Sequence, residues 1–381
     1  MLKLKYKKAI ASKLNSNPEN IFLYWKGRVA LYAILKAMSV SKDDEVILPA
    51  FTCVVVPNAI MYLGARPVYV DISDQTYNSD INEIKKAITN KTRVIICQNT
   101  FGLSSDIEQI IEIAKSNNLY TIEDCTHGFG GYYNGKPNGS YCDAAFYSTQ
   151  WNKPFSTGIG GFLVVNNNSL LKQVQDQEKD KVVPSNNDQI ILKSLILFQK
   201  YFINRFTYNL LVSFYRFLSK KNLIIGSTQG TEISDLKMPP DYFKDISSVQ
   251  IKAGLRSLKN LDELNMLRKK NAGDYTNFLK MNVKKHVDEK YFNNHLFLKY
   301  PVLVSDRKLF FEKAKKKWLV FGDWFFSPIY PVKDNLKRWD YNQEKFPVAV
   351  GISERVLNLP TDIKDNSKVL EFLKDNIEFI I

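Results

Sequence analysis

The stretch TIEDCTHGFGGYYNGKPNGSYCDAAFYSTQWNKPFSTGIGG, residues 121–161, carries the pattern that decides the fold. It opens on a short apolar run that ends in Asp124, and a second run, AAFYST, leads into a tight turn that holds Lys153. A glycine-rich segment and a third apolar run, GFLVV, follow the lysine. Short apolar runs bounded by turn residues are typical of buried strands. The stretch therefore predicts strands whose ends carry a carboxylate and a lysine.

The same rhythm extends toward the N-terminus. Helix-like runs at 29–38 and 107–116, and within NAIMYLGA and INEIKKAIT, alternate with the strand-like runs VILPA, RPVYVDI and RVIICQNT. This alternation predicts an α/β fold with a large, mixed and mostly parallel sheet flanked by helices. Active sites in such sheets lie at the carboxyl ends of strands, so we expect Asn99, Asp124 and the residues after Thr149 to lie near one another.

The chain of 381 residues is long enough for a large domain and a smaller one. The alternation breaks at about residue 175 and does not return before about 240. Shorter segments such as YPVLV and VLEFLKDN follow to the end. We predict a large α/β domain at 1–250 with a helical insertion at about 175–240, and a small α+β domain at 251–381.

The insertion contains ILKSLILFQKYFINRFTYNLLVSFYRFL, an apolar and aromatic run interrupted by Lys193, Lys200, Arg205 and Arg216. These charges are too frequent for a simple membrane span and predict one or two amphipathic helices. We prefer helices packed on the domain or on a second subunit. The alternative is peripheral contact with a membrane surface through 190–218.

Charge and composition narrow the class of protein. The net charge of +14 comes from scattered residues, without a basic arm, zinc-finger spacing or aromatic RNA-binding signature, so no nucleic-acid partner is expected. Four cysteines without Cys-x-x-Cys spacing are typical of reduced thiols in a cytoplasmic protein. Three separated histidines do not suggest a metal site. The N-terminus lacks the apolar region of a signal peptide, so we expect a cytoplasmic protein.

Lys153 and Asp124 are the first candidate site residues. Lys153 lies among Trp151, Pro154 and Phe155, where partial loss of water lowers the pKa of the amine and makes its neutral form a nucleophile. A surface lysine with a buried stem is the alternative. Asp124, at the end of a predicted strand, is either a helix cap or a functional anion.

A third candidate feature is the start of the helix-like run GRVALYAILKAM. Gly27 opens it, and the unpaired N–H groups of a helix start bind phosphate, with added charge from Arg28. Ser148 ends the strand before Lys153. Alone, this is an ordinary helix start. An amine nucleophile, a carboxylate and a phosphate-binding helix start are together what pyridoxal 5'-phosphate (PLP) requires.

The sequence also resembles the sugar aminotransferases of the DegT/DnrJ/StrS family, which are fold type I PLP-dependent enzymes. The resemblance covers about residues 20–170 and 245–375. It is carried by residues 121–161 together with DDEVILPAFTCVVVPNAIMYLGARPVYVDI, VIICQNTFG and FPVAVGISERVLNLP. The order and spacing of Asp124, Ser148 and Lys153 match the family pattern.

The resemblance implies a role for each matching residue. Lys153 would be the Schiff-base lysine and the acid/base of the proton shift, and Asp124 would pair with the pyridine nitrogen. His127 stands where the family has Gln or His near the phenolic oxygen of the cofactor. The phosphate would be bound by Ser148, Gly27 and Arg28.

The resemblance also implies the reaction and the partners. The family usually transfers an amino group from glutamate to a nucleotide-linked keto sugar, in the biosynthesis of amino sugars and surface glycans. Its members are usually homodimers with active sites at the subunit interface.

Several positions depart from the family. Lys26-Gly27-Arg28 replaces a common Ser-Gly-Thr, and Cys53 replaces an aromatic residue that often stacks on the cofactor. The family segment that reaches the partner's cofactor is not recognisable near DYFKDISSVQ, where Lys244 is a candidate substitute. A family histidine near the substrate is replaced around residues 328–330.

These departures leave alternatives open. A dehydratase of the same family usually has another residue in place of the lysine, so Lys153 argues against it. A non-catalytic or regulatory protein on this fold is a second alternative. A membrane-associated member that acts on a lipid-linked or non-sugar substrate is a third.

Overall fold

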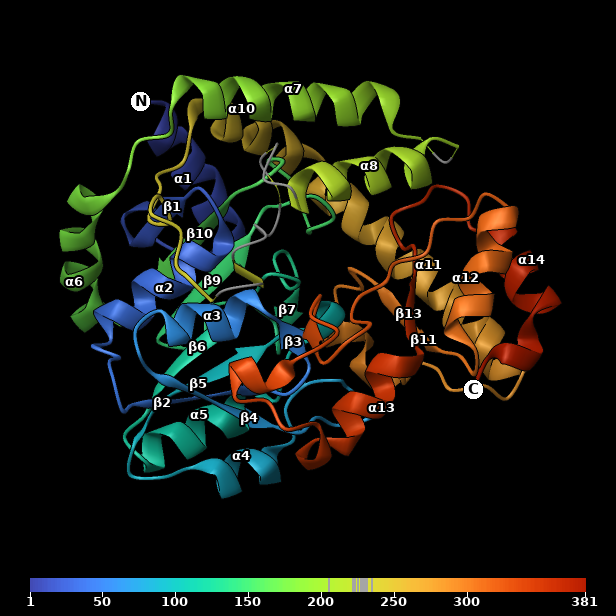
Figure 1. Cartoon of the computed structure of the whole chain (residues 1–381), viewed down its shortest axis with the longest axis horizontal. Helices are drawn as coiled ribbons and strands as arrows, with labels where there is room; N and C mark the ends of the chain where they lie inside the picture. The colour runs from blue at the N-terminus through green and yellow to red at the C-terminus, as the bar shows by residue number, and fades with distance from the viewer. Residues whose placement is uncertain (205, 221–223, 225, 227–231, 234–235) are drawn as a thin grey trace.

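The computed structural model describes residues 1–204, 206–220, 224, 226, 232–233 and 236–381. A seven-stranded sheet forms the centre of its larger part, in the order β1-β10-β9-β6-β5-β2-β4 (Figure 1). Its strands, in chain order, are β1 (Ile21–Tyr24), β2 (Glu45–Pro49), β4 (Arg66–Val70), β5 (Thr92–Gln98), β6 (Tyr120–Asp124), β9 (Ala144–Ser148) and β10 (Gly161–Val165).

The sheet is mixed and mostly parallel, which confirms the predicted fold class. β10 runs antiparallel to its neighbours β1 and β9, whereas β9, β6, β5, β2 and β4 run parallel. The register pairs Gln98 with Asp124, and Asp124 with Phe146. The carboxyl ends of β5, β6 and β9 therefore meet at one edge of the sheet.

Helices cover both faces of the sheet because both faces of its strands are apolar. Val46 and Leu48 of β2 belong to the core under α2 (Gly27–Ala37) and α3 (Val55–Met61). The alternate residue Ile47 belongs to the core under α4 (Ile81–Ala87) and α5 (Ile107–Ser116). At the β1 edge, a further core lies beneath α1 (Leu2–Leu14) and α10 (Ser248–Ser257), and α6 (Leu171–Asp176) packs near α2.

The C-terminal part is α+β. Strands β11 (Tyr300–Leu303) and β13 (Val356–Leu359) pair antiparallel. They share one apolar core with α11 (Leu261–Met281), α12 (Arg307–Lys316) and α14 (Ser367–Asp375), while α13 (Pro347–Arg355) leads into β13. The boundary near residue 250 stays a prediction.

Two short strand pairs lie outside the main sheet. β7 (Tyr132–Tyr133) pairs with β8 (Lys136–Pro137). β3 (Thr52–Cys53) pairs in parallel with β12 (Ile329–Tyr330), which belongs to the C-terminal part. This second pair brings residues late in the chain to the carboxyl edge of the main sheet.

The predicted amphipathic helices are α7 (Asn186–Phe202) and α8 (Tyr208–Lys220), in the upper part of Figure 1. Of the charges that interrupt the sequence run, Arg205 and the side chain of Arg216 lie outside the described residues. Within the described ranges, no helix combines the length and apolar character needed to cross a membrane.

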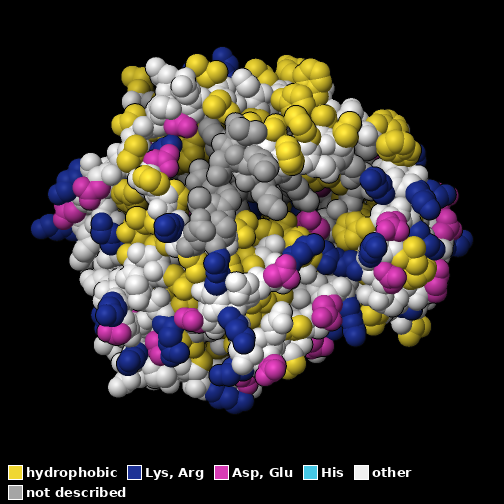
Figure 2. All heavy atoms as spheres, viewed as in Figure 1, with side chains coloured by type: hydrophobic (Ala, Val, Ile, Leu, Met, Phe, Trp, Pro, Cys, Tyr) yellow, Lys and Arg dark blue, Asp and Glu magenta, His cyan; other side chains and the backbone are white. Residues whose placement is uncertain are grey.

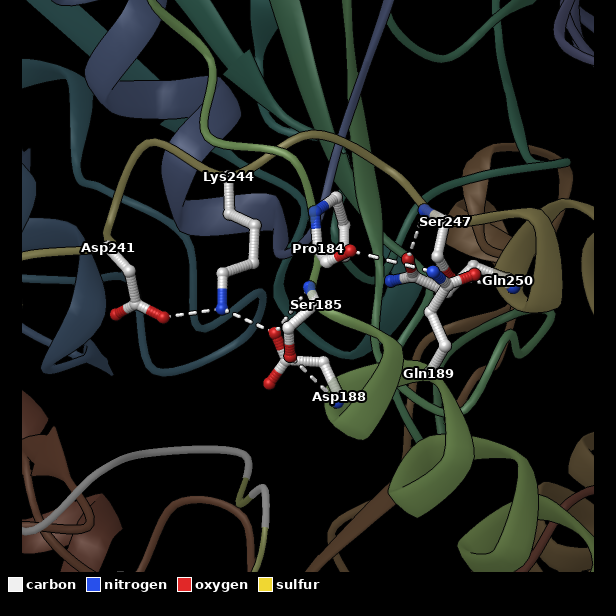
Figure 3. Close-up of polar contacts among 8 residues, drawn as sticks. All are labelled: Pro184, Ser185, Asp188, Gln189, Asp241, Lys244, Ser247 and Gln250. Carbon is white, nitrogen blue, oxygen red and sulfur yellow. Dashed lines mark hydrogen bonds and ion pairs between the residues drawn. The ribbon is translucent and has the colours of Figure 1, made fainter.

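Polar contacts fix the start of α7 (Figure 3). Ser185 and Asp188 form a capping box, each side chain accepting the other's backbone N–H. The Lys244 amine donates to Asp188 at 3.0 Å and also pairs with Asp241. Lys244 is thus engaged in holding α7, and it is not among the residues that line the cavity described next.

Candidate active site

A cavity of about 430 Å³ lies at the carboxyl ends of β5, β6 and β9. All of the predicted site residues line it: Gly27, Arg28, Asp124, His127, Ser148 and Lys153. They come from four places in the chain, namely the start of α2, the end of β6 with the turn after it, the end of β9, and the loop between β9 and β10. The fold therefore brings the whole predicted set together.

Lys153 lies in the loop that joins β9 to β10, with its amine 4.7 Å from the centroid of the Trp324 ring. Removal of water by the surrounding protein lowers the pKa of this amine to about 8, although the charge of Asp124 acts in the opposite direction. Near neutral pH, a much larger fraction of Lys153 is therefore the neutral nucleophile than for an ordinary lysine.

Asp124 is the last residue of β6 and is buried. Its Oδ1 accepts the backbone N–H of Thr126 at 2.9 Å, and burial raises the pKa of the carboxyl. The residues that follow form a turn and not a helix, so Asp124 does not act as a helix cap. A buried carboxylate at a cavity wall favours a cationic partner.

His127 is a buried, neutral imidazole. Its Nδ1 accepts the backbone N–H of Phe101 at 3.2 Å, and burial holds its pKa well below the usual value. The proton therefore resides on Nε2, which can donate a hydrogen bond. The ring stacks on Trp324 with centroids 4.8 Å apart and planes 4° from parallel.

The start of α2 lies unusually close to the end of β9. A Cβ on Gly27 would lie 2.8 Å from the Tyr147 carbonyl oxygen and 3.0 Å from the Cα of Ser148. Only glycine fits this approach, which places the first N–H groups of α2 beside Ser148. The side chain of Lys26, the N-cap residue, does not accept a hydrogen bond from these N–H groups. They can therefore donate to another acceptor, such as a phosphate.

Two basic side chains flank this helix start. Arg28 is buried and donates to Glu232 at 2.5 Å, so a carboxylate already balances its charge. Lys26 also lines the cavity, and loss of water lowers the pKa of its amine to about 8. Sequence reasoning singled out Arg28 and did not foresee Glu232.

Sequence reasoning also missed cavity residues. Gln98 and Thr126 line the cavity, whereas the Asn99 side chain donates to Glu123 at 2.8 Å and is not part of the lining. The expectation that Asn99 lies close to Asp124 holds for the backbone, since the Asn99 N–H donates to the Asp124 carbonyl. The register that pairs Gln98 with Asp124 explains which side chain reaches the cavity.

Trp324 is the aromatic residue that sequence reasoning did not identify. Cys53, which the resemblance places where an aromatic residue often stacks on the cofactor, lines the cavity without an aromatic face. Trp324 comes from the segment just before β12, and the β3–β12 pairing brings that segment to the cavity.

Comparisons with known proteins identify relatives of this chain. The model of the DegT/DnrJ/EryC1/StrS aminotransferase family matches residues 25–190 and 242–369. GDP-perosamine synthase from Escherichia coli O157:H7 is 44% identical over 144 residues, which are 38% of this chain and 40% of that protein. The chain thus spans less than half the length of that relative.

Two further proteins are similar over most of the chain. The spore coat polysaccharide biosynthesis protein SpsC of Bacillus subtilis is 25% identical over 362 residues, covering 92% of this chain and 83% of its own. The solved structure of NtdA from Bacillus subtilis, with bound cofactor PMP, has a TM-score of 0.71 and 22% identity, and the match covers 99% of this chain and 77% of that one. The predicted fold and aminotransferase family are confirmed, and NtdA, a protein of the same fold, holds PMP. On the strength of the matched ranges, this chain belongs to the DegT/DnrJ/EryC1/StrS aminotransferase family.

Proposed function

We propose that this protein is a PLP-dependent aminotransferase that moves an amino group from glutamate to a keto sugar. The observation that carries the proposal is Lys153, whose pKa is lowered to about 8 and which shares one cavity with Asp124 and the start of α2. The amino group replaces the carbonyl oxygen of the sugar, and glutamate leaves as the corresponding keto acid.

The residues present fit PLP. A buried carboxylate, Asp124, suits a protonated ring nitrogen, and the glycine-only approach at Gly27 leaves helix N–H groups open for a phosphate. When bound, the cofactor supplies an aldehyde that takes up the amino group and a ring that accepts electrons.

Each side chain then has a proposed task. Lys153 holds the cofactor and carries the proton between carbon and nitrogen. Asp124 keeps the ring nitrogen protonated, and the Nε2–H of His127 donates to the phenolic oxygen.

The phosphate has its own proposed ligands. They are the hydroxyl of Ser148 and the backbone N–H groups of Gly27 and Arg28, with added positive charge from Lys26. Trp324 supplies the aromatic face that Cys53 lacks.

The keto-sugar acceptor is supported by the relatives. The name GDP-perosamine synthase points to a nucleoside diphosphate as the carrier of the sugar in that relative, and this carrier is the first candidate here. A second cavity, of about 1470 Å³, shares Asn152, Tyr208, Val212 and Trp324 with the first. Basic and acidic side chains both line it, and its basic residues, such as Lys299 and Arg307, suit anionic groups. A lipid carrier is the second candidate. We further propose a cytoplasmic homodimer.

The test is an absorbance spectrum of purified protein with PLP, before and after glutamate. We expect a visible band that decays as glutamate donates its amino group, with Lys153→Ala as the control that shows no such band. A folded wild-type protein without the band would favour the non-catalytic alternative. A band that glutamate leaves unchanged would contradict glutamate as the donor.

A further inference from the structure

The cavity that holds Lys153 has a second, apolar end. Helices α7 and α8, with the residue that follows α7, contribute a set of hydrophobic side chains to its lining, which we call the apolar arm: Leu195, Phe198, Ile203, Leu211, Phe214 and Leu218. All six residues of the arm belong to residues 191–241, the segment that the family match leaves out. The arm is therefore a feature of this chain beyond what the family match accounts for.

The arm offers little to a polar ligand. The described residues of α7 and α8 that line the cavity include no charged side chain, and their polar atoms come from Gln199, Tyr208 and Tyr215. A sugar or nucleotide placed there would lose hydrogen bonds to water that the walls do not replace. An aliphatic chain makes no hydrogen bonds to water that it could lose, and its transfer from water into the arm is favourable.

The rest of the protein buries few of the side chains of the apolar arm. In α7, Leu192 is the buried residue, where it contacts Trp25 and Ile159. Phe198 and Phe214 line the cavity and are nevertheless 40% and 58% exposed, so the arm reaches the protein surface between them. In Figure 2, hydrophobic side chains gather along the edge where Figure 1 places α7 and α8. Phe202, Leu210 and Phe217 of these two helices are exposed.

We propose that the amino acceptor carries a long apolar chain, and that this chain lies in the apolar arm while the keto sugar lies at Lys153. The inference rests on the proposed function and selects the lipid carrier, the second of its two candidate carriers, over the nucleoside diphosphate. Because the arm is concave and continuous with the site of the reactive amine, it suits a ligand that is bonded to the reacting group.

The experiment measures binding of alkyl phosphates to the full-length, PLP-loaded protein by calorimetry. The probes are ethyl phosphate, n-decyl phosphate below its micelle-forming concentration, and farnesyl phosphate. Each buried methylene raises affinity several-fold, so we expect decyl phosphate to bind at least about 100-fold more tightly than ethyl phosphate. If decyl phosphate binds more tightly than farnesyl phosphate, the chain is a straight acyl-type chain. If farnesyl phosphate binds more tightly than decyl phosphate, the chain is a polyprenyl chain.

Two neighbouring residues provide a matched pair of variants. Leu211 lines the arm, whereas Leu210 is 75% exposed and does not line it. Leu211→Trp narrows the arm and should weaken decyl phosphate binding about tenfold or more, while Leu210→Trp should leave it unchanged. Leu218→Trp and Phe217→Trp form a second pair if Leu211→Trp does not fold.

The outcomes separate this proposal from the proposed function. Absence of the visible cofactor band from the wild-type protein would contradict the function itself. Binding of the alkyl phosphates is compared only between variants that keep that band. The proposal is overturned if affinity does not depend on the length of the alkyl chain, or if both variants of a pair lose affinity for decyl phosphate equally. Either result would indicate adhesion of the probe to the protein surface. The proposal is also overturned if the dimer fails to bind the alkyl phosphates that the monomer binds, because a second copy of the chain would then occupy the arm.

Discussion

The backbone N–H of Phe101 donates to Nδ1 of His127 at 3.2 Å, and this one contact fixes which histidine nitrogen carries the proton. Phe101 adopts a left-handed backbone conformation, with φ of 55°, a conformation that L-residues rarely adopt and that occurs at functional sites. The sequence indicated that His127 lies near the cofactor. Its tautomer follows from Phe101, whose N–H occupies Nδ1 and leaves the proton on Nε2.

The first prediction concerns this donor. His127→Gln keeps a side-chain N–H and should retain most of the PLP affinity, whereas His127→Ala should lose about tenfold, the worth of one hydrogen bond. Equilibrium titration followed by the visible band measures both variants. Equal affinities for the two would show that His127 acts by packing against Trp324 alone.

The second prediction concerns the pH dependence of Lys153. Burial lowers its pKa to about 8, so the neutral amine, which captures the cofactor, increases as pH rises through 8 and then levels off. Stopped-flow absorbance between pH 6.5 and 9.5 should show this rise, with a free lysine derivative as the reference for titration of PLP itself. A capture rate that keeps rising toward pH 10.5 would contradict the lowered pKa.

The third prediction separates two roles of Asp124. Asp124→Asn keeps an oxygen that can accept the Thr126 N–H, but it removes the negative charge from the cavity wall. We expect an unchanged fold by circular dichroism and a fall of about 100-fold or more in the glutamate half-reaction. If the rate stays at the wild-type value, Asp124 serves only the turn at Thr126.

The fourth prediction concerns Glu123, the buried neighbour of Asp124. Burial raises the pKa of Glu123 to about 7, although Asn99 and the N–H of Gly139 donate to its carboxyl group. Between about pH 4.5 and 7 the Glu123 carboxyl group loses its proton in the unfolded chain but keeps it in the folded chain. The free energy of unfolding therefore falls as pH rises, by at most about 3 kcal/mol.

Urea unfolding at pH 5 and pH 7.5 measures that fall. Glu123→Gln should remove most of the difference, and the exposed Glu112→Gln is the control. A pH difference that Glu123→Gln leaves intact would assign the effect to another group.

The fifth prediction compares two glycines. Gly27→Ala forces a Cβ against Tyr147 and should reduce the free energy of unfolding by about 1–3 kcal/mol, together with the PLP affinity. Gly273→Ala, in α11 with open space around its Cβ, should stabilise the protein by about 0.5–1 kcal/mol. Thermal or urea unfolding of both variants checks the signs, and destabilisation of equal size would argue against a steric cause at Gly27.

The sequence by itself determined the alternation of strands and helices, since apolar periodicity reflects the local geometry of each element. It also placed Asp124 and Ser148 at strand ends and Lys153 in the turn after one, and consecutive parallel strands end at the same edge of a sheet. Only the tertiary structure placed Trp324 against His127 and Glu232 against Arg28. It alone directed α7 and α8 into the cavity of Lys153. Those contacts join residues far apart in the chain, and they depend on how whole elements pack, which no local pattern records.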